Sequence, residues 1–176
     1  MEYTVIFLPL IGAIIGYLGG SIIKYFSEIV TSLLVSISAV LSILLFWNGI
    51  QNNTYGNYKI FEWISSGNFI ANWSINIDPL SSIMLVVVTF VSALVHIYSI
   101  GYMSHDPHKP RFMSYLSLFT FSMLVLVVSD NFLQLFFGWE GVGLCSYLLI
   151  GFWYKKESAN NAAIKALLLT ELVILD

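Results

Sequence analysis

The strongest candidate for a chemical role in this 176-residue chain is Glu140, an acidic side chain in the middle of an apolar segment. It follows Asp130 by about ten residues, which in a helix places it ~15 Å deep, near the middle of a bilayer. A carboxylate at that depth is costly unless it is paired or hydrated. Desolvation raises the pKa of a carboxyl, whereas a nearby cation lowers it. Where these two effects balance, the group can take up and release a proton. We therefore interpret Glu140 as a proton-transfer residue rather than as an inert, permanently protonated carboxyl.

Small residues surround this glutamate. Gly138, Gly141 and Gly143 would let neighbouring helices approach closely and leave room for water, and Ser146 offers a hydroxyl. This composition favours a polar site at a helix contact over an isolated charge in lipid.

Two further ionisable residues lie in apolar segments. His96 precedes Tyr102 by six residues, about 9 Å from the end of its span. Its imidazole could shuttle protons or could be a neutral group hydrogen-bonded between helices, and the sequence leaves both open. Lys165 could extend to the membrane surface or supply a cation to an internal polar chain.

The composition indicates a membrane protein. Hydrophobic residues make up 58% of the chain and charged residues 10%, against about 25% charged in soluble domains. The net charge of −3 gives no support to a nucleic-acid partner. Cys145 is the single cysteine, so neither an internal disulfide nor a thiolate metal cluster is expected. The segment 105–108 has metal-ligand residue types, but Pro107 and Pro110 favour a solvated loop, and we expect no metal site.

Apolar segments long enough to cross a bilayer organise the chain as one membrane domain. We predict an all-α polytopic membrane protein with five transmembrane helices and the start of a sixth. The expected spans are 5–23, 29–50, 79–102, 112–129, 131–154 and, in part, 159–176. Alternation of polar and apolar residues in the loop 51–78 predicts a small external β-hairpin that turns at 65–68. Asp130 is expected to cap the fifth helix.

Basic residues near helix ends predict the orientation. One set of loops carries five of them, Lys24, Lys109, Arg111, Lys155 and Lys156, whereas the opposite set carries Lys59 alone. We expect the first set in the cytoplasm or matrix, and the hairpin and Met1 outside.

Specific runs of this sequence resemble a known family. The runs are DPLS at 78–81, VHIYSIGYM at 95–103, RFMSYL at 111–116 and DNFLQLFFGWEGVGLCSYLLIGFWY at 130–154. They are similar to the chain 5 (subunit L) family of the proton-pumping NADH-quinone oxidoreductase, respiratory complex I. Related cation/proton antiporter subunits share the glutamate but differ in the residues that follow it.

The resemblance implies an antiporter-like membrane subunit that takes part in proton translocation coupled to NADH oxidation by quinone. Glu140 matches the glutamate that the family pairs with a lysine on a later helix, and Lys165 falls in the family's Ala-Ala-x-Lys-Ala segment. The chain itself would hold no redox centre, because NADH, FMN, iron–sulfur clusters and quinone belong to other subunits. Expected partners are the other membrane subunits and the lipid of a bacterial cell membrane or a mitochondrial inner membrane.

Residues 167–175 depart from the family pattern, which continues with Phe-Ile-x-Asn-Arg-Val-Gly-Asp. One codon string for them, TTA TTA CTA ACA GAG TTG GTG ATT TTA, encodes Phe-Ile-Thr-Asn-Arg-Val-Gly-Asp-Phe once a single T is restored before it. We therefore hypothesise that a one-base deletion shifted the reading frame and truncated the product. A cation/proton antiporter subunit and a non-functional remnant remain alternative interpretations.

Overall fold

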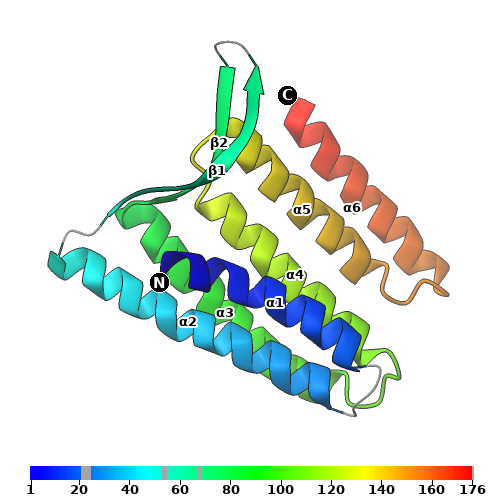
Figure 1. Cartoon of the computed structure of the whole chain (residues 1–176). Helices are drawn as coiled ribbons and strands as arrows, with labels where there is room; N and C mark the ends of the chain where they lie inside the picture. Colours follow the sequence, from blue (N-terminus) through cyan, green and yellow to red (C-terminus); the bar gives the residue numbers. More distant parts are fainter. Residues whose placement is uncertain (21–24, 53–54, 67–68, 176) are drawn as a thin grey trace.

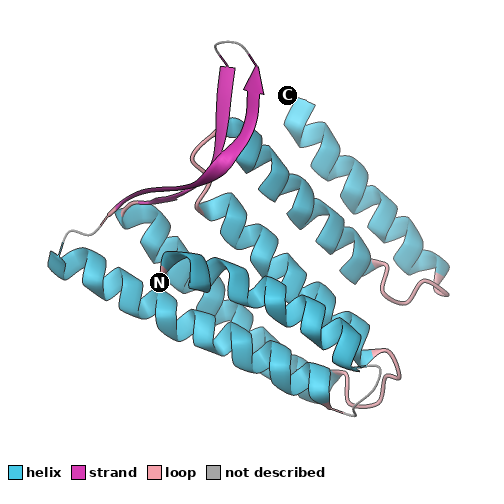
Figure 2. Cartoon of the chain, viewed as in Figure 1, coloured by secondary structure: helices cyan, strands magenta, loops and turns pink. Residues whose placement is uncertain are grey.

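The computed structural model describes residues 1–20, 25–52, 55–66 and 69–175, with the backbone alone at 66, 69 and 171–175. The chain forms helices and one pair of strands (Figure 2). In chain order they are α1 (Glu2–Gly20), α2 (Phe26–Asn52), β1 (Gly56–Ser66), β2 (Phe69–Ile77), α3 (Pro79–Tyr102), α4 (Lys109–Val127), α5 (Phe132–Ile150) and α6 (Glu157–Leu175).

The first four helices pack together, and the last two are added on one side. α1 and α3 each contact both α2 and α4, whereas α5 lies between α4 and α6 (Figure 1). The hairpin extends from one end of the helices, and the α3–α4 loop lies at the opposite end (Figure 1). We call the latter the basic end, because Lys109, Arg111, Lys155 and Lys156 gather there.

Within the described residues, α1 to α5 are long and apolar enough to cross a membrane. Many large apolar side chains on their outer faces are exposed, among them Leu18, Ile29 and Phe90, as expected for a surface covered by lipid. The predicted fold class, five spanning helices with a further helix and a small hairpin, is confirmed. Lys24, one of the residues used to predict orientation, lies outside the described residues, and the sidedness of the basic end stays a prediction.

Hydroxyl groups line the contacts between the first helices. Ser38 donates a hydrogen bond to the carbonyl of Val5 at 2.6 Å, joining α2 to α1. The hydroxyls of Ser42 and Thr89 are 2.7 Å apart and join α2 to α3. Small hydroxyl side chains allow close helix approach and supply polar contacts where lipid offers none.

The hairpin predicted in the loop 51–78 is confirmed, with β1 antiparallel to β2 and Tyr58 opposite Ile75. The register shifts at two places, between Lys59 and Phe61 and between Glu62 and Ile64, so the ribbon bends there. At its base, Ile75 is buried in the apolar cluster between the helix ends. Residues 67 and 68 of the predicted turn lie outside the described residues.

The helices that leave the hairpin end begin at side-chain caps. Asp78 accepts the backbone N–H of Ser81, and the Ser81 hydroxyl accepts the Asp78 N–H, which forms a capping box on α3. The predicted cap of the fifth helix was wrong by one residue. Asn131, in extended backbone conformation, accepts the N–H of Gln134, whereas Asp130 turns outward and accepts the Ser74 hydroxyl of the hairpin at 2.8 Å.

Candidate functional site

Glu140 lies near the middle of the 19 residues of α5, and its side chain is half-buried. The helix that carries this carboxyl, α5, packs against α4 and against α6. Its depth along an apolar helix is what a proton-carrying group in a membrane requires. The role assigned to Glu140 from the sequence stays a prediction.

Two glycines beside Glu140 bring α4 against α5. A Cβ on Gly138 would lie 2.8 Å from the backbone N and Cα of Leu126, and one on Gly141 would lie 2.8 Å from the Ser122 hydroxyl oxygen. Any larger residue would push the helices apart, so the predicted close approach at these glycines is confirmed. The Ser122 hydroxyl, which the sequence interpretation did not include, thus lies at the α4–α5 contact, against the glycine that follows Glu140.

The third glycine, Gly143, lies at the contact between α5 and α6. A Cβ on Gly143 would lie 2.9 Å from Cγ2 of Thr170, so α6 reaches α5 at the same level. Lys165, also on α6, is exposed and forms no ion pair within 4.0 Å among the residues that the structure describes. Its two interpretations therefore stay open.

His96 is fully buried between α3 and α4. Its Nδ1 lies 2.8 Å from the carbonyl oxygen of Ser92 and its Nε2 lies 2.9 Å from the Ser117 hydroxyl. A carbonyl only accepts, so Nδ1 donates; in a neutral imidazole Nε2 would then accept the Ser117 proton. These contacts tie α3 to α4 and are compatible with a neutral imidazole, and the two interpretations of His96 from the sequence stay open. A proton-shuttle role for His96 stays a prediction.

Polar residues at the start of α5 attach it to the hairpin. The side-chain oxygen of the buried Gln134 accepts the N–H of Ser74 at 3.2 Å, and Asn131 donates to the carbonyl of Asn72 at 2.7 Å. Nearby, the rings of Trp73 and Phe137 meet edge to face with centroids 5.0 Å apart. The hairpin therefore positions the helix that carries Glu140. A glutamine in the first turn of an apolar helix was the signal that sequence reasoning passed over.

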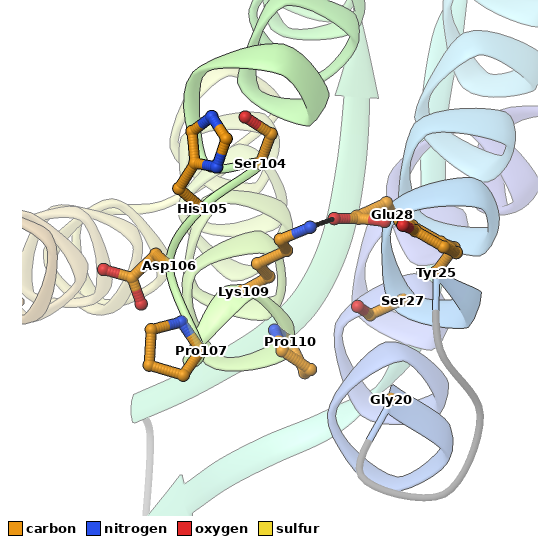
Figure 3. Close-up of a pocket in the computed structure, with 10 residues that line it drawn as sticks. All are labelled: Gly20, Tyr25, Ser27, Glu28, Ser104, His105, Asp106, Pro107, Lys109 and Pro110. Atoms are coloured by element: carbon orange, nitrogen blue, oxygen red, sulfur yellow. Dashed lines mark ion pairs between the residues drawn. The ribbon is translucent and has the colours of Figure 1, made fainter.

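The structure also contains a buried ion pair that the sequence interpretation missed. Glu28, in the first turn of α2, lies 3.1 Å from the ammonium of Lys109, in the first turn of α4; their side chains are 3% and 18% exposed. Each residue lies in the first turn of a helix that begins at the basic end, and this shared position was the signal for the pair in the sequence. The pair borders a cavity of about 380 Å³ (Figure 3).

Known protein families match two long parts of the chain. Residues 63–113 match the family described as NADH-ubiquinone oxidoreductase (complex I), chain 5 N-terminus. Residues 129–174, which include Glu140 and Lys165, match the family described as NADH:quinone oxidoreductase/Mrp antiporter, TM.

Curated relatives extend the similarity over most of the chain. NADH-quinone oxidoreductase subunit L of Rickettsia conorii is 55% identical over 94% of this chain and 25% of its own length. NADH-ubiquinone oxidoreductase chain 5 is 52% identical over 96% of this chain in Arabidopsis thaliana, and 51% over 96% in Phytophthora infestans; 25% and 26% of those proteins are covered. The chain belongs to the complex I chain 5 (subunit L) family. It spans about a quarter of the length of these relatives.

Membership of the chain 5 family agrees with the fold. The relatives named above are subunits of NADH-quinone or NADH-ubiquinone oxidoreductase from a bacterium and from mitochondria-containing organisms. Five apolar helices fit a multi-pass membrane protein of that kind. The matched region 129–174 contains all of α5, so the similarity includes the helix that carries Glu140.

Proposed function

We propose that this chain acts as an antiporter-like membrane subunit of NADH-quinone oxidoreductase and contributes to proton translocation coupled to NADH oxidation by quinone. Glu140 is the residue that takes up and releases the proton. The observation that carries this proposal is an acidic side chain halfway along a membrane-spanning helix, within the part that matches the antiporter-type family.

The surroundings of Glu140 support the assignment physically. Contacts at Gly138 and Gly141 hold α4 within van der Waals distance of α5, and Gly143 does the same for α6. A carboxyl in a closely packed, weakly polar layer responds strongly to the movement of a charge nearby, because interactions between charges are less screened there. Its protonation state can therefore follow changes in neighbouring helices.

The proposal assigns the redox chemistry to partner subunits. NADH, FMN, iron–sulfur clusters and quinone would bind elsewhere in the assembly, and this chain would contact other membrane subunits and lipid. Lys165 and His96 are further proton-transfer candidates within the same proposal. The exposed position of Lys165 leaves its ammonium available to a neighbouring subunit or helix.

A cation/proton antiporter subunit is the second candidate function. It is favoured by the description of the second family, which includes Mrp antiporters. The first family, described only as complex I chain 5, favours the oxidoreductase. The two functions differ in whether proton movement depends on NADH oxidation.

The test is a substitution at the matching glutamate of an intact family member, because this chain covers only a quarter of such proteins. Glu140→Gln should lower proton translocation per NADH oxidised, roughly tenfold or more, since a proton-carrying group is removed without a change of shape. Glu140→Asp, which keeps the carboxyl, is the matched control and should retain part of the activity. Unchanged pumping in the glutamine variant would contradict the proposal.

A further inference from the structure

The ion pair between Glu28 and Lys109 borders a cavity at the basic end. In Figure 3 the Lys109 side chain extends from α4 toward Glu28 on α2, with the residues of the α3–α4 loop on the other side of the cavity. Glu28 is 3% exposed, whereas Lys109 is 18% exposed. The ammonium is therefore the member of the pair that meets water, and the carboxylate lies behind it.

The carboxylate of Glu28 is poorly satisfied. Neither of its oxygens has a hydrogen-bond partner of good geometry among the described residues, and Oε1 is held by the charge of Lys109 alone. A buried carboxylate usually accepts several hydrogen bonds, because its desolvation is otherwise uncompensated.

Among the described residues, the titratable and charged groups around the pair come from three segments. They line the same cavity, of about 380 Å³, and they are Tyr25 before α2, His105 and Asp106 in the α3–α4 loop, and the pair itself. The ring of Tyr25 lies 5.1 Å from the Lys109 ammonium. Since a water molecule occupies about 30 Å³ in the liquid, the cavity can hold several.

Hydroxyl groups continue inward from the pair. Around Gly16 of α1, an added Cβ would lie 2.7 Å from the methyl group of Thr31, 3.5 Å from the hydroxyl oxygen of Ser114 and 3.8 Å from Cβ of Ser27. The Ser114 hydroxyl is buried and has no hydrogen-bond partner in the described part of the chain. Further along α4, one turn from Ser114, the Ser117 hydroxyl donates to His96. Of these residues, Ser27 and Thr31 lie within one turn of Glu28 on α2.

We propose that Glu28 and Lys109 form a proton-uptake site at the basic end, separate from Glu140. In the first step a Lys109 N–H bond breaks and an O–H bond forms on Glu28 Oε1, 3.1 Å away, which leaves a neutral amine and a neutral carboxylic acid. The amine then takes a proton from water in the cavity and becomes an ammonium again. One proton has moved from the cavity to the buried carboxyl. A role of this step in transport rests on the proposed function, but the step itself does not.

Hydrophobic carbodiimides test the step, because they modify buried carboxyls only in the protonated form. The whole chain, purified in detergent micelles, is treated with dicyclohexylcarbodiimide at neutral pH, and the modified peptides are identified by mass spectrometry. We expect an adduct on Glu28 that is absent from Glu28→Gln and present in Glu140→Gln. If the wild-type chain forms no adduct at Glu28, the proposal is overturned, whatever happens at Glu140.

Lys109→Arg separates proton uptake from a purely structural ion pair. Arginine keeps the positive charge and the contact, but its guanidinium does not give up a proton. The variant should reduce modification of Glu28 by about tenfold or more, since the donor of the first step is lost. The matched control Lys156→Arg, at an exposed loop position, should leave it unchanged. Equal modification in wild type and Lys109→Arg, with both eluting as the same folded species in gel filtration, would show that the pair only clamps α2 to α4.

Discussion

The hydroxyl oxygen of Ser122 lies 2.8 Å from the position that a Cβ on Gly141 would occupy, so α4 and α5 are in close contact at this glycine. Three residues earlier, Gly138 faces the backbone of Leu126 at the same distance. Because a hydroxyl can rotate away but a backbone cannot, Gly138 is the stricter of the two contacts. These glycines therefore set how closely α4 approaches α5 beside Glu140.

Gly138→Ala should destabilise the α4–α5 contact. The added methyl would lie 2.8 Å from the Leu126 backbone, and overpacking of this kind costs about 1–3 kcal/mol. Gly101→Ala is the control, because nothing lies within 4 Å of a Cβ there, and alanine is favoured over glycine in a helix by about 0.5–1 kcal/mol. Thermal unfolding in detergent, followed by circular dichroism, should lower the midpoint for Gly138→Ala and leave it equal or higher for Gly101→Ala. The opposite order would mean that α4 and α5 are not in backbone contact.

Ser117→Ala should destabilise the contact between α3 and α4. The substitution removes the donor to Nε2 of the fully buried His96, and an unsatisfied buried acceptor costs about 1–3 kcal/mol. Ser36→Ala is the matched control, because within the part of the chain that the structure describes the Ser36 hydroxyl bonds only to the carbonyl of Ser32 in its own helix. The same unfolding measurement should show a larger loss for Ser117→Ala. Equal losses would argue that the His96–Ser117 hydrogen bond contributes nothing to stability.

Local patterns in the sequence were enough to predict the helices, the hairpin and the small residues around Glu140. Apolar length marks a membrane span, period-two alternation marks a strand, and a glycine beside a buried charge marks a close contact. Each of these signals lies within a short stretch of chain. The described residues confirm the fold class and the close contacts at Gly138, Gly141 and Gly143.

Contacts between distant residues could not be predicted in the same way. Glu28 and Lys109 meet because two helices start side by side at the basic end, which depends on how the bundle is packed. The choice between Asp130 and Asn131 as the cap of α5 also depended on the hairpin, since Ser74 engages the aspartate and leaves the asparagine to bind the helix. Either residue type alone is a good cap.

Asn131 should couple the hairpin to α5. Its side-chain oxygen caps the helix at Gln134, and its side-chain nitrogen donates to the carbonyl of Asn72. Asn131→Ala loses both contacts and should cost about 1–2 kcal/mol from the cap alone, whereas Asn131→Asp keeps the cap and loses only the donor. Amide hydrogen exchange should therefore quicken at Gln134 in Asn131→Ala but not in Asn131→Asp. Equal exchange at Gln134 in both variants and in the wild type would mean that this cap does not hold the start of α5.

Acid should loosen the start of α3 through Asp78. Hydrogen bonds from the Ser81 hydroxyl, and then from the Ser81 backbone N–H, hold the pKa of Asp78 below its ordinary value of 3.8, against the smaller opposing effect of burial. A carboxyl whose pKa is lower in the folded state stabilises the fold fully above its unfolded pKa, and this contribution is lost as the pH falls through the folded pKa. Asp78→Asn keeps a capping oxygen that does not titrate. Amide exchange of Ser81 and Ser82, extrapolated to a common intrinsic rate, should therefore increase below about pH 4 in the wild type and stay constant in Asp78→Asn. A wild-type profile as flat as that of the variant would show that the carboxylate form of Asp78 is not what caps α3.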